Sequence, residues 1–181
     1  PIRWLDELTI RTCHRSARGI LLYRDYEMSV GSQYVGAACA LWVLPDLQTR
    51  KLLNVTHTPI VELKETVGGL TPRIKKLTAL HTPDDRTFVE DRLMRYSDTD
   101  VNAHVNNTKY ADFACDALDL AARREGEFIS ELEITYHEEC QPGERIRIST
   151  ANIQPDRFVH GEGADQDSRF DVRLRLNIEG Q

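Results

Sequence analysis

Alternation of apolar and polar residues dominates both ends of the chain. Near the start, Leu8, Ile10 and Thr12 alternate with polar neighbours. A second alternating set covers residues 20–28, and the continuous apolar run 35–44 follows it. Alternation predicts strands with one buried face, and a continuous apolar run predicts a strand buried on both faces. We therefore predict three successive antiparallel strands in this segment.

The C-terminal end repeats this plan. Ile146 and Ile148 alternate with arginines, a short strand is expected around residues 157–160, and residues 169–178 form the clearest alternating run of the chain. A constant offset pairs Leu8 with Ile146 and brings the two sets of strands into register. The pattern therefore indicates an internal duplication.

Between the two ends, the pattern changes from strand to helix and back. We predict strands over residues 88–96 and 128–137, a polar, turn-rich stretch over 97–107, and a helix from residue 108 to about residue 123. The apolar residues of the helix recur at the spacing of one helix face. They are Tyr110, Phe113, Ala114, Ala117 and Leu118. Asn106 or Asn107 is suited to cap the N-terminus of this helix.

These elements predict an α+β protein in three parts. Residues 1–56 supply only the closing strands of a first copy of the unit, and residues 87–181 contain the complete second copy. Residues 57–86 form a connector punctuated by Pro and Gly, with a short helical candidate over 60–67. The chain starts with Pro1 rather than Met, so we expect that further residues precede it in the full protein.

Composition excludes several classes of function. The chain has 181 residues, is 40% hydrophobic and carries a net charge of -6, which is typical of a globular protein and argues against one that coats nucleic acid. Its longest apolar run, 35–44, is too short to span a membrane, which takes roughly 20 residues, and no signal peptide is recognisable. The four cysteines form no CxxC pair, so we expect free thiols in a reducing compartment, the cytoplasm.

Reactive side chains gather at two places. Residues 98–107 lie just before the predicted helix, where unpaired backbone N–H groups and the helix dipole can stabilise an oxyanion. Residues 137–140, His-Glu-Glu-Cys, end the strand that follows the helix. Consecutive elements are usually neighbours in space, so the two clusters are expected to face each other. A histidine beside a glutamate can act as a general base. The alternative is that Asp98, Asp100 and Asn102 are turn residues and Asn106 a helix cap.

The 16-residue run from Arg95 to Tyr110, RYSDTDVNAHVNNTKY, resembles the signature of the acyl-acyl-carrier-protein thioesterases of plants and bacteria. Downstream, residues 134–140 resemble a second motif of that family, a strand ending in Glu-Cys. Upstream, residues 40–50 are similar to the end of its first domain. The resemblance implies a tandem hotdog fold, in which each antiparallel sheet wraps a long helix, with the first copy incomplete here.

Carried over by motif position, the active-site residues of the family are Asp100, Asn102, His104 and Glu139, with Cys140 beside them. The resemblance implies hydrolysis of the fatty acyl thioester on the phosphopantetheine arm of acyl carrier protein. This reaction releases free fatty acid, ends fatty acid synthesis and needs no cofactor.

Two chemistries remain open. In the first, His104 and Glu139 activate a water, Asn102 orients the water or the carbonyl, Asp100 holds the site together, and N–H groups near Asn106 and Asn107 bind the oxyanion. In the second, Cys140 is the nucleophile, which requires a lowered thiol pKa. We favour water, because neighbouring carboxylates disfavour the thiolate.

Strict alternation raises a difficulty for Glu139. If Ile134 and Tyr136 lie on the apolar face of their strand, then Glu138 and Cys140 follow on that face and Glu139 falls on the polar one. Either a bulge redirects Glu139, or the polar face of the strand lines the site.

Other interpretations remain. His104, His137, Glu139 and Cys140 could ligate a metal, but without a CxxC or HExxH spacing we expect none. We interpret the His-Thr-Pro sequences at residues 57 and 81 as turns. An acyl-CoA thioesterase and a non-catalytic acyl-thioester binding module are the alternative functions.

The expected partner is an acidic carrier protein, which requires a local basic patch. The candidates are two groups, Arg73, Lys75 and Lys76, and Arg11, Arg15 and Arg18. No nucleic acid partner is expected. The sequence leaves both a monomer and a homodimer open, because an incomplete first copy would expose apolar sheet surface.

Overall fold

The computed structural model describes residues 2–49, 51–57, 70, 74 and 77–179. The chain divides into two compact units, Pro1–Thr78 and Ala79–Gln181, which are treated one at a time. The predicted short helix over residues 60–67 lies outside the described residues. Within the described part, no helix is long and apolar enough to cross a membrane.

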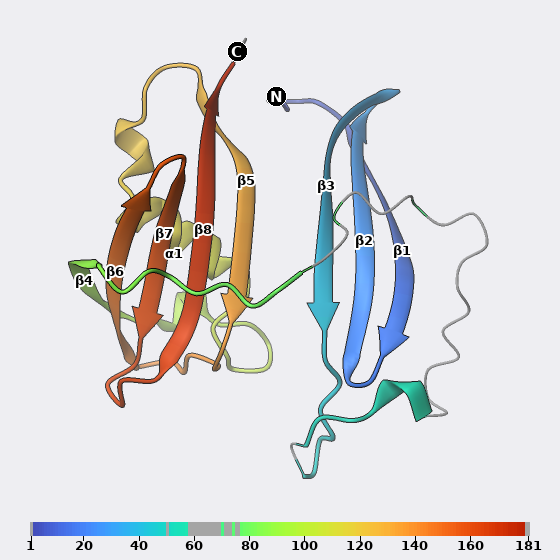
Figure 1. Cartoon of the computed structure of the whole chain (residues 1–181), viewed down its shortest axis with the longest axis vertical. Helices are drawn as coiled ribbons and strands as arrows, with labels where there is room; N and C mark the ends of the chain where they lie inside the picture. Colours follow the sequence, from blue (N-terminus) through green and yellow to red (C-terminus); the bar gives the residue numbers. More distant parts are fainter. Residues whose placement is uncertain (1, 50, 58–69, 71–73, 75–76, 180–181) are drawn as a thin grey trace. The chain divides into compact units, whose positions relative to one another are not determined.

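The first unit contains a three-stranded antiparallel sheet in the order β1-β2-β3 (Figure 1). Its strands are β1 (Leu8–Arg18), β2 (Leu21–Val30) and β3 (Gln33–Trp42), followed by the short 3-10 helix η1 (Val55–His57). The three predicted strands are confirmed. The prediction that β3 is buried on both faces is wrong, because β3 is an edge strand and its Trp42 is 51% exposed.

A buried ion pair crosses this sheet. The Arg15 guanidinium donates to both carboxylate oxygens of Asp25, at 2.7 Å from Nε to Oδ2, and also to the carbonyl oxygen of Ile74 at 2.6 Å. The Arg15 guanidinium therefore already has partners inside the unit. It is not available to an acidic carrier protein, so its place in the predicted basic patch is wrong. Of the other predicted basic patch, Arg73, Lys75 and Lys76 lie outside the described residues.

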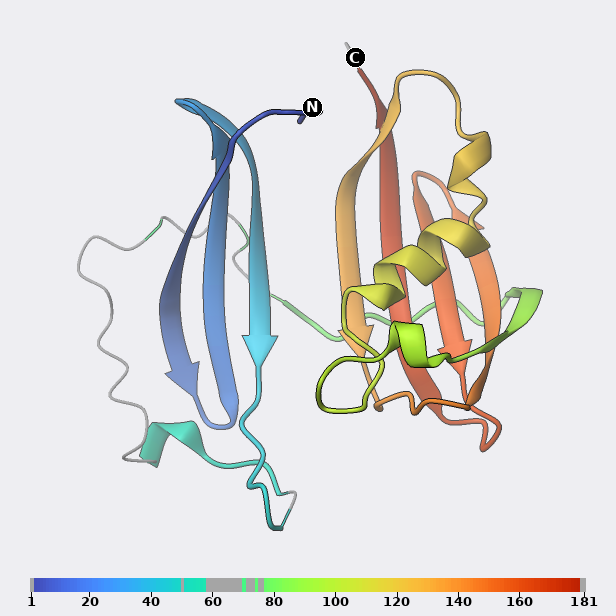
Figure 2. The same ribbon diagram turned by 180° about the vertical axis from the view of Figure 1, so that it is seen from behind.

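The second unit is a five-stranded antiparallel sheet in the order β4-β6-β7-β8-β5. Its elements are β4 (Thr87–Leu93), α1 (Lys109–Ala117), β5 (Glu127–Tyr136), β6 (Arg145–Ile153), β7 (Asp156–Glu162) and β8 (Ser168–Ile178). Helix α1 lies across one face, and residues 79–86 cross the opposite face, as the two views show (Figures 1 and 2). One helix packed on an antiparallel sheet confirms the α+β class.

Two predicted ends are wrong. The helix stops at Ala117 rather than near residue 123, because Asp119 takes a left-handed conformation (φ 49°) and a short 3-10 helix, η3 (Leu120–Ala122), follows it. Asp tolerates this conformation better than most residues because its short polar side chain can bond locally. The strand predicted over 88–96 ends at Leu93, and the 3-10 helix η2 (Tyr96–Asp98) begins the turn-rich stretch.

The core of the second unit lies between α1 and the sheet. Its buried residues are Met94, Val105, Tyr110, Phe113, Ala114, Cys140, Ile146, Ile148, Val159, Phe170, Val172 and Leu174. Three of them, Phe170, Val172 and Leu174, alternate along β8, as the sequence predicts. Gly161 faces the Phe170 ring so closely that a Cβ there would lie 2.1 Å from ring atom Cε1.

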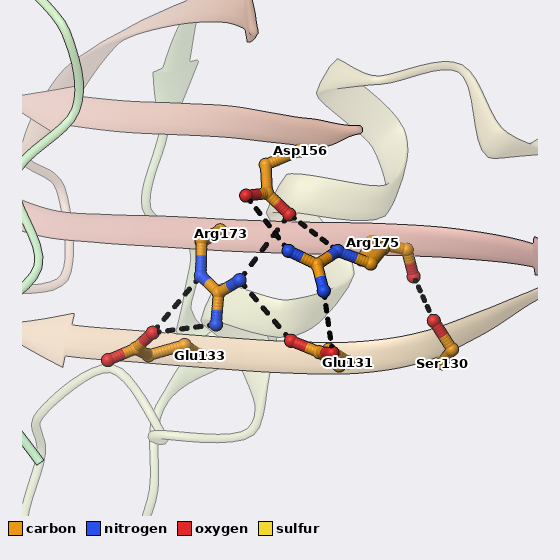
Figure 3. A network of polar contacts seen from close by, with 6 residues as sticks. All are labelled: Ser130, Glu131, Glu133, Asp156, Arg173 and Arg175. Atoms are coloured by element: carbon orange, nitrogen blue, oxygen red, sulfur yellow. Dashed lines mark hydrogen bonds and ion pairs between the residues drawn. The ribbon is translucent and has the colours of Figure 1, made fainter. Parts of the chain in front are cut away.

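The alternate residues of β8 form an ionic network on the other face of the sheet (Figure 3). Arg173 contacts Glu131, Glu133 and Asp156, and Arg175 contacts Glu131 and Asp156. Exposed ion pairs each contribute little, but a network of bidentate arginines pins the register of β5, β7 and β8.

Candidate active site

The loop between β4 and α1 is closed by Asp98. Its carboxylate accepts the Arg95 N–H at 2.8 Å, and its carbonyl oxygen accepts the Asn106 N–H at 2.8 Å. An isolated antiparallel bridge between Thr99 and Val105 narrows the loop further. These bonds give residues 99–105 a defined conformation at the N-terminal end of α1.

Within this loop, Asp100 holds Asn102. The Asp100 carboxylate accepts the Asn102 backbone N–H at 2.8 Å, and its second oxygen lies 3.5 Å from the side-chain Nδ2. The Asp100 N–H donates to the carbonyl oxygen of His104 at 2.9 Å, which closes the turn with Ala103 at φ 61°. The turn interpretation of Asp100 is thus correct, and the turn brings Asn102 and His104 onto one short loop.

The two predicted clusters meet at His104 and Glu139. The Val105 N–H donates to the Cys140 carbonyl oxygen at 3.2 Å, which joins the loop to the segment after β5. His104 Nε2 lies 3.3 Å from Glu139 Oε2, and the side chains are 28% and 64% exposed. An imidazole that lies at this distance from a carboxylate and is open to solvent has the geometry of a general base oriented by that carboxylate.

The direction of Glu139 is explained by the end of β5. The N–H groups of His137 and Glu138 both donate to the carbonyl oxygen of Arg169, at 2.9 and 3.4 Å. Two successive donors on one acceptor is the hydrogen-bond pattern of a β-bulge, which shifts the alternation of side chains. Of the two explanations that the sequence left open, the bulge therefore fits. Glu139 lies against His104, and Cys140 lies in the core.

Arg169 anchors this bulge with its side chain as well. It is only 7% exposed, and its guanidinium donates to Glu138 at 3.0 Å, Glu144 at 2.9 Å and Asp165 at 2.7 Å. The hydrogen bond to Asp165, against the effect of burial, raises the pKa of Arg169. Sequence reasoning missed this residue, because its only signal is an arginine at the start of an alternating strand.

Cys140 is fully buried, at 0% exposure. Burial raises the pKa of its thiol to about 11, although the hydrogen bond from Tyr110 opposes this rise. The thiol is therefore protonated near neutral pH and is directed into the core.

Asn106 and Asn107 organise the start of α1. The Oδ1 of Asn106 accepts the Thr108 N–H at 3.0 Å and the Thr108 hydroxyl at 2.8 Å. The N-cap of α1 is Thr108, so the predicted cap at Asn106 or Asn107 is wrong by one or two residues. The Asn106 N–H is used by Asp98, so it is not free to bind an oxyanion. The carbonyl oxygen of Asn107 accepts the Tyr136 hydroxyl at 3.1 Å.

The metal ligands considered from the sequence are not brought together. His137 turns toward Asp171 of β8, with Nε2 2.8 Å from Oδ2. Among the described residues, His104, Glu139 and Cys140 join no group of three metal-ligating atoms.

Comparison with known proteins identifies the family. The profile of the acyl-ACP thioesterase C-terminal domain matches residues 81–181. The chain belongs to this family. It is 24% identical over 200 residues to oleoyl-acyl carrier protein thioesterase 1 of Arabidopsis thaliana, covering 98% of this chain and 53% of that protein. It is 28% identical over 184 residues to an acyl-[acyl-carrier-protein] hydrolase of Cuphea viscosissima, covering 98% of this chain and 43% of that protein.

Solved structures of acyl-ACP thioesterases share the fold. One from Bacteroides thetaiotaomicron has a TM-score of 0.78 at 17% identity, covering 94% of this chain and 68% of that one. The 12:0-ACP thioesterase from Umbellularia californica has a TM-score of 0.73 at 21% identity, covering 97% of this chain and 68% of that one. The chain spans about half the length of the two curated relatives.

Proposed function

We propose that this chain hydrolyses the thioester of fatty acyl-acyl carrier protein, releasing free fatty acid and ending fatty acid synthesis. The observation that carries the proposal is the contact between His104, on the loop that leads into α1, and Glu139, in the segment after β5. Membership of the acyl-ACP thioesterase family supports the substrate class. Both relatives described above are named for action on acyl carrier protein thioesters.

The first step is attack by water. Glu139 faces Nε2 of His104, which leaves Nδ1 as the ring nitrogen that accepts a proton from water. The oxygen of this water adds to the thioester carbonyl carbon, and its lone pair forms the new C–O bond. Asn102, held by Asp100, orients the water or the carbonyl through its side-chain amide. The N–H groups of Asn106, Thr108 and Lys109 are already hydrogen-bonded, so α1 acts on the negative oxygen that forms through the positive end of its dipole.

The second step is collapse of the tetrahedral intermediate. The C–S bond breaks, its electron pair stays with the sulfur of the phosphopantetheine arm, and the His104 imidazolium returns the proton to that sulfur. The products are a fatty acid and the free thiol of the carrier protein. Water is the nucleophile in this scheme because the Cys140 thiol is buried and its pKa is raised to about 11.

The architecture that we propose is a tandem hotdog. Strands β1 to β3 form an antiparallel meander like β6 to β8, which supports the reading of residues 1–56 as the closing strands of a first hotdog. Residues 57–86 are then the connector, and residues 87–181 form the second hotdog with the catalytic loop. A homodimer is one assembly that would cover apolar sheet surface. The four unpaired cysteines support a reducing compartment such as the cytoplasm.

The experiment is thiol release from acyl-acyl carrier protein and acyl-CoA substrates of several chain lengths. The proposal predicts release from carrier-protein substrates by the wild-type chain and loss of release in His104→Ala. Release from acyl-CoA alone would indicate an acyl-CoA thioesterase instead. Binding of acyl carrier protein by a folded chain without release would indicate a binding module and would overturn the proposal.

A further inference from the structure

A second cluster of titratable groups lies on the face of the sheet opposite α1. Its centre is Asp171 of β8, which is only 2% exposed. Oδ1 of Asp171 accepts the Thr82 N–H at 3.1 Å and lies 2.9 Å from Nδ1 of His160, while Oδ2 lies 2.8 Å from Nε2 of His137. The carboxylate thus has one oxygen held by Thr82 and His160 and the other turned toward His137.

His81 completes this cluster from the segment that crosses the sheet. Its ring stacks on that of His137, with centroids 5.8 Å apart. His81 is exposed, and the His137 side chain is 23% exposed. One ligand atom from each of His81, His137 and Asp171 lies within 4.8 Å of the other two. The segment is tied to the sheet by Thr82 and by Leu80, whose N–H donates to Thr135 Oγ1 at 2.9 Å.

We propose that His81, His137 and Asp171 bind a divalent cation, and that their donor set selects Zn²⁺. Two imidazole nitrogens and one carboxylate oxygen are ligands that zinc prefers, and three protein ligands leave a fourth position for water. The exposed His81, beside a His137 side chain that is 23% exposed, gives the ion access from solvent. The site is separate from the loop that carries His104, and the proposal does not depend on the thioesterase reaction.

The surroundings of Asp171 match those of a metal-binding carboxylate. Ligands in metal sites are usually oriented by hydrogen bonds from a surrounding layer of residues, and Thr82 and His160 supply these here. Burial disfavours the charge of Asp171, but hydrogen bonds from His160, Thr82 and His137 hold the pKa of this carboxyl well below its usual range. Asp171 is therefore an anion at neutral pH.

Binding requires a small local change. Ligand atoms about 2.0 Å from a tetrahedral zinc ion lie roughly 3.3 Å apart. The Asp171 and His137 atoms must therefore separate slightly from their 2.8 Å contact, and His81 must move inward. The ion replaces the proton shared by His137 Nε2 and Asp171 Oδ2, and that proton passes to Nδ1 of His137 or to solvent. The bound ion would fasten residues 79–83 to β5 and β8.

The test is calorimetric titration of Zn²⁺ into the whole chain after treatment with a chelator. The expected result is one equivalent bound, with a rise in melting temperature, because an ion that binds only the folded state stabilises it. His81→Ala should weaken binding by at least about tenfold. The matched control is His57→Ala, which removes the histidine of the other His-Thr-Pro sequence and should bind zinc like the wild type.

Two further variants keep the test decisive. His137→Ala removes the second histidine ligand and should also weaken binding, with folding checked by circular dichroism. Equal zinc affinity in wild type, His81→Ala and His137→Ala would overturn the proposal, because the ion would then lie elsewhere. Failure of the wild type to bind Zn²⁺ would also overturn it and leave the cluster as a hydrogen-bond network only. Neither result bears on turnover, so this proposal and the proposed function can fail separately.

Discussion

The backbone N–H of Val105 donates to the carbonyl oxygen of Cys140 at 3.2 Å, and this one bond aligns two segments that a helix and a strand separate in sequence. Each partner is the chain neighbour of a proposed catalytic residue. The bond therefore brings His104 to Glu139, whose side chains lie 3.3 Å apart. Because the backbone makes the alignment, the loop should keep its conformation when either side chain is removed.

Removing either member of the His104 and Glu139 pair should therefore abolish most turnover without unfolding the chain. General base catalysis typically contributes a factor of about 100 to 10,000, and His104→Ala should lose an effect of this size in kcat. Glu139→Gln keeps the shape but removes the charge that supports the imidazolium, so it should also be strongly impaired. Steady-state thiol release and urea unfolding of each variant check the two halves of this prediction.

Cys140→Ala should retain a large part of the wild-type turnover. The thiol is buried in the core and faces away from Glu139, so its loss removes packing rather than a nucleophile. A stability loss of about 1 kcal/mol is expected, as for a typical core truncation. Thiol release at saturating substrate is the measurement. A folded but inactive Cys140→Ala, with Cys140→Ser equally inactive, would restore the thiol as the nucleophile.

Cys140 should also make stability depend on alkaline pH. Burial raises the pKa of its thiol from 9.0 to about 11 in the folded chain, so the unfolded chain loses this proton first as pH rises. The contribution to the free energy of unfolding is complete below pH 9 and is lost as pH rises toward 11, by up to about 2 to 3 kcal/mol. Urea unfolding at pH 7, 9 and 10.5 should show a steeper decline for wild type than for Cys140→Ala. Equal slopes would mean that the thiol titrates normally.

Arg169→Met should lower both stability and kcat. Its guanidinium is the shared donor for Glu138, Glu144 and Asp165, and only Glu144 is largely buried, so losing this donor should cost about 1 to 3 kcal/mol. The bulge that directs Glu139 should loosen, so kcat should fall more than KM rises. Arg11→Met is the matched control, because the Arg11 side chain is 63% exposed in its ion pair with Glu27, and its loss should change stability by less than about 1 kcal/mol.

Gly161→Ala should destabilise the second unit. The new Cβ would lie 2.1 Å from Cε1 of the Phe170 ring, which is buried in the core and cannot move freely. Overpacking of this kind costs about 1 to 3 kcal/mol. Gly36→Ala is the control, since its Cβ would meet only the flexible end of Met28 at 3.4 Å. Thermal unfolding of both variants should give a clearly lower melting temperature for Gly161→Ala alone.

The elements and the meeting of the two clusters could be predicted from the sequence, because they depend on local periodicity and on chain order. The alternation of β8 is visible residue by residue, and its apolar half is the half that packs in the core. The contact between His104 and Glu139 could be predicted because α1 is followed directly by β5, and consecutive elements are usually neighbours in space.

What could not be predicted depends on contacts between distant residues. The helix ends at Ala117 because Asp119, two residues later, has a left-handed backbone, which no periodicity shows. The choice between a bulge and a polar face for Glu139 is decided by the carbonyl of Arg169, a residue of another strand. His81, His137 and Asp171 come together only once the sheet has formed, and the His-Thr-Pro at residue 81 therefore looks like a simple turn in the sequence.

The most direct test of the central claim is the rate of thiol release from acyl-acyl carrier protein by wild type and His104→Ala, measured side by side on folded protein. We predict measurable release by the wild type and a loss of about a hundredfold or more in the variant. Near-normal release by His104→Ala would contradict the account, because the imidazole would then have no part in activating water.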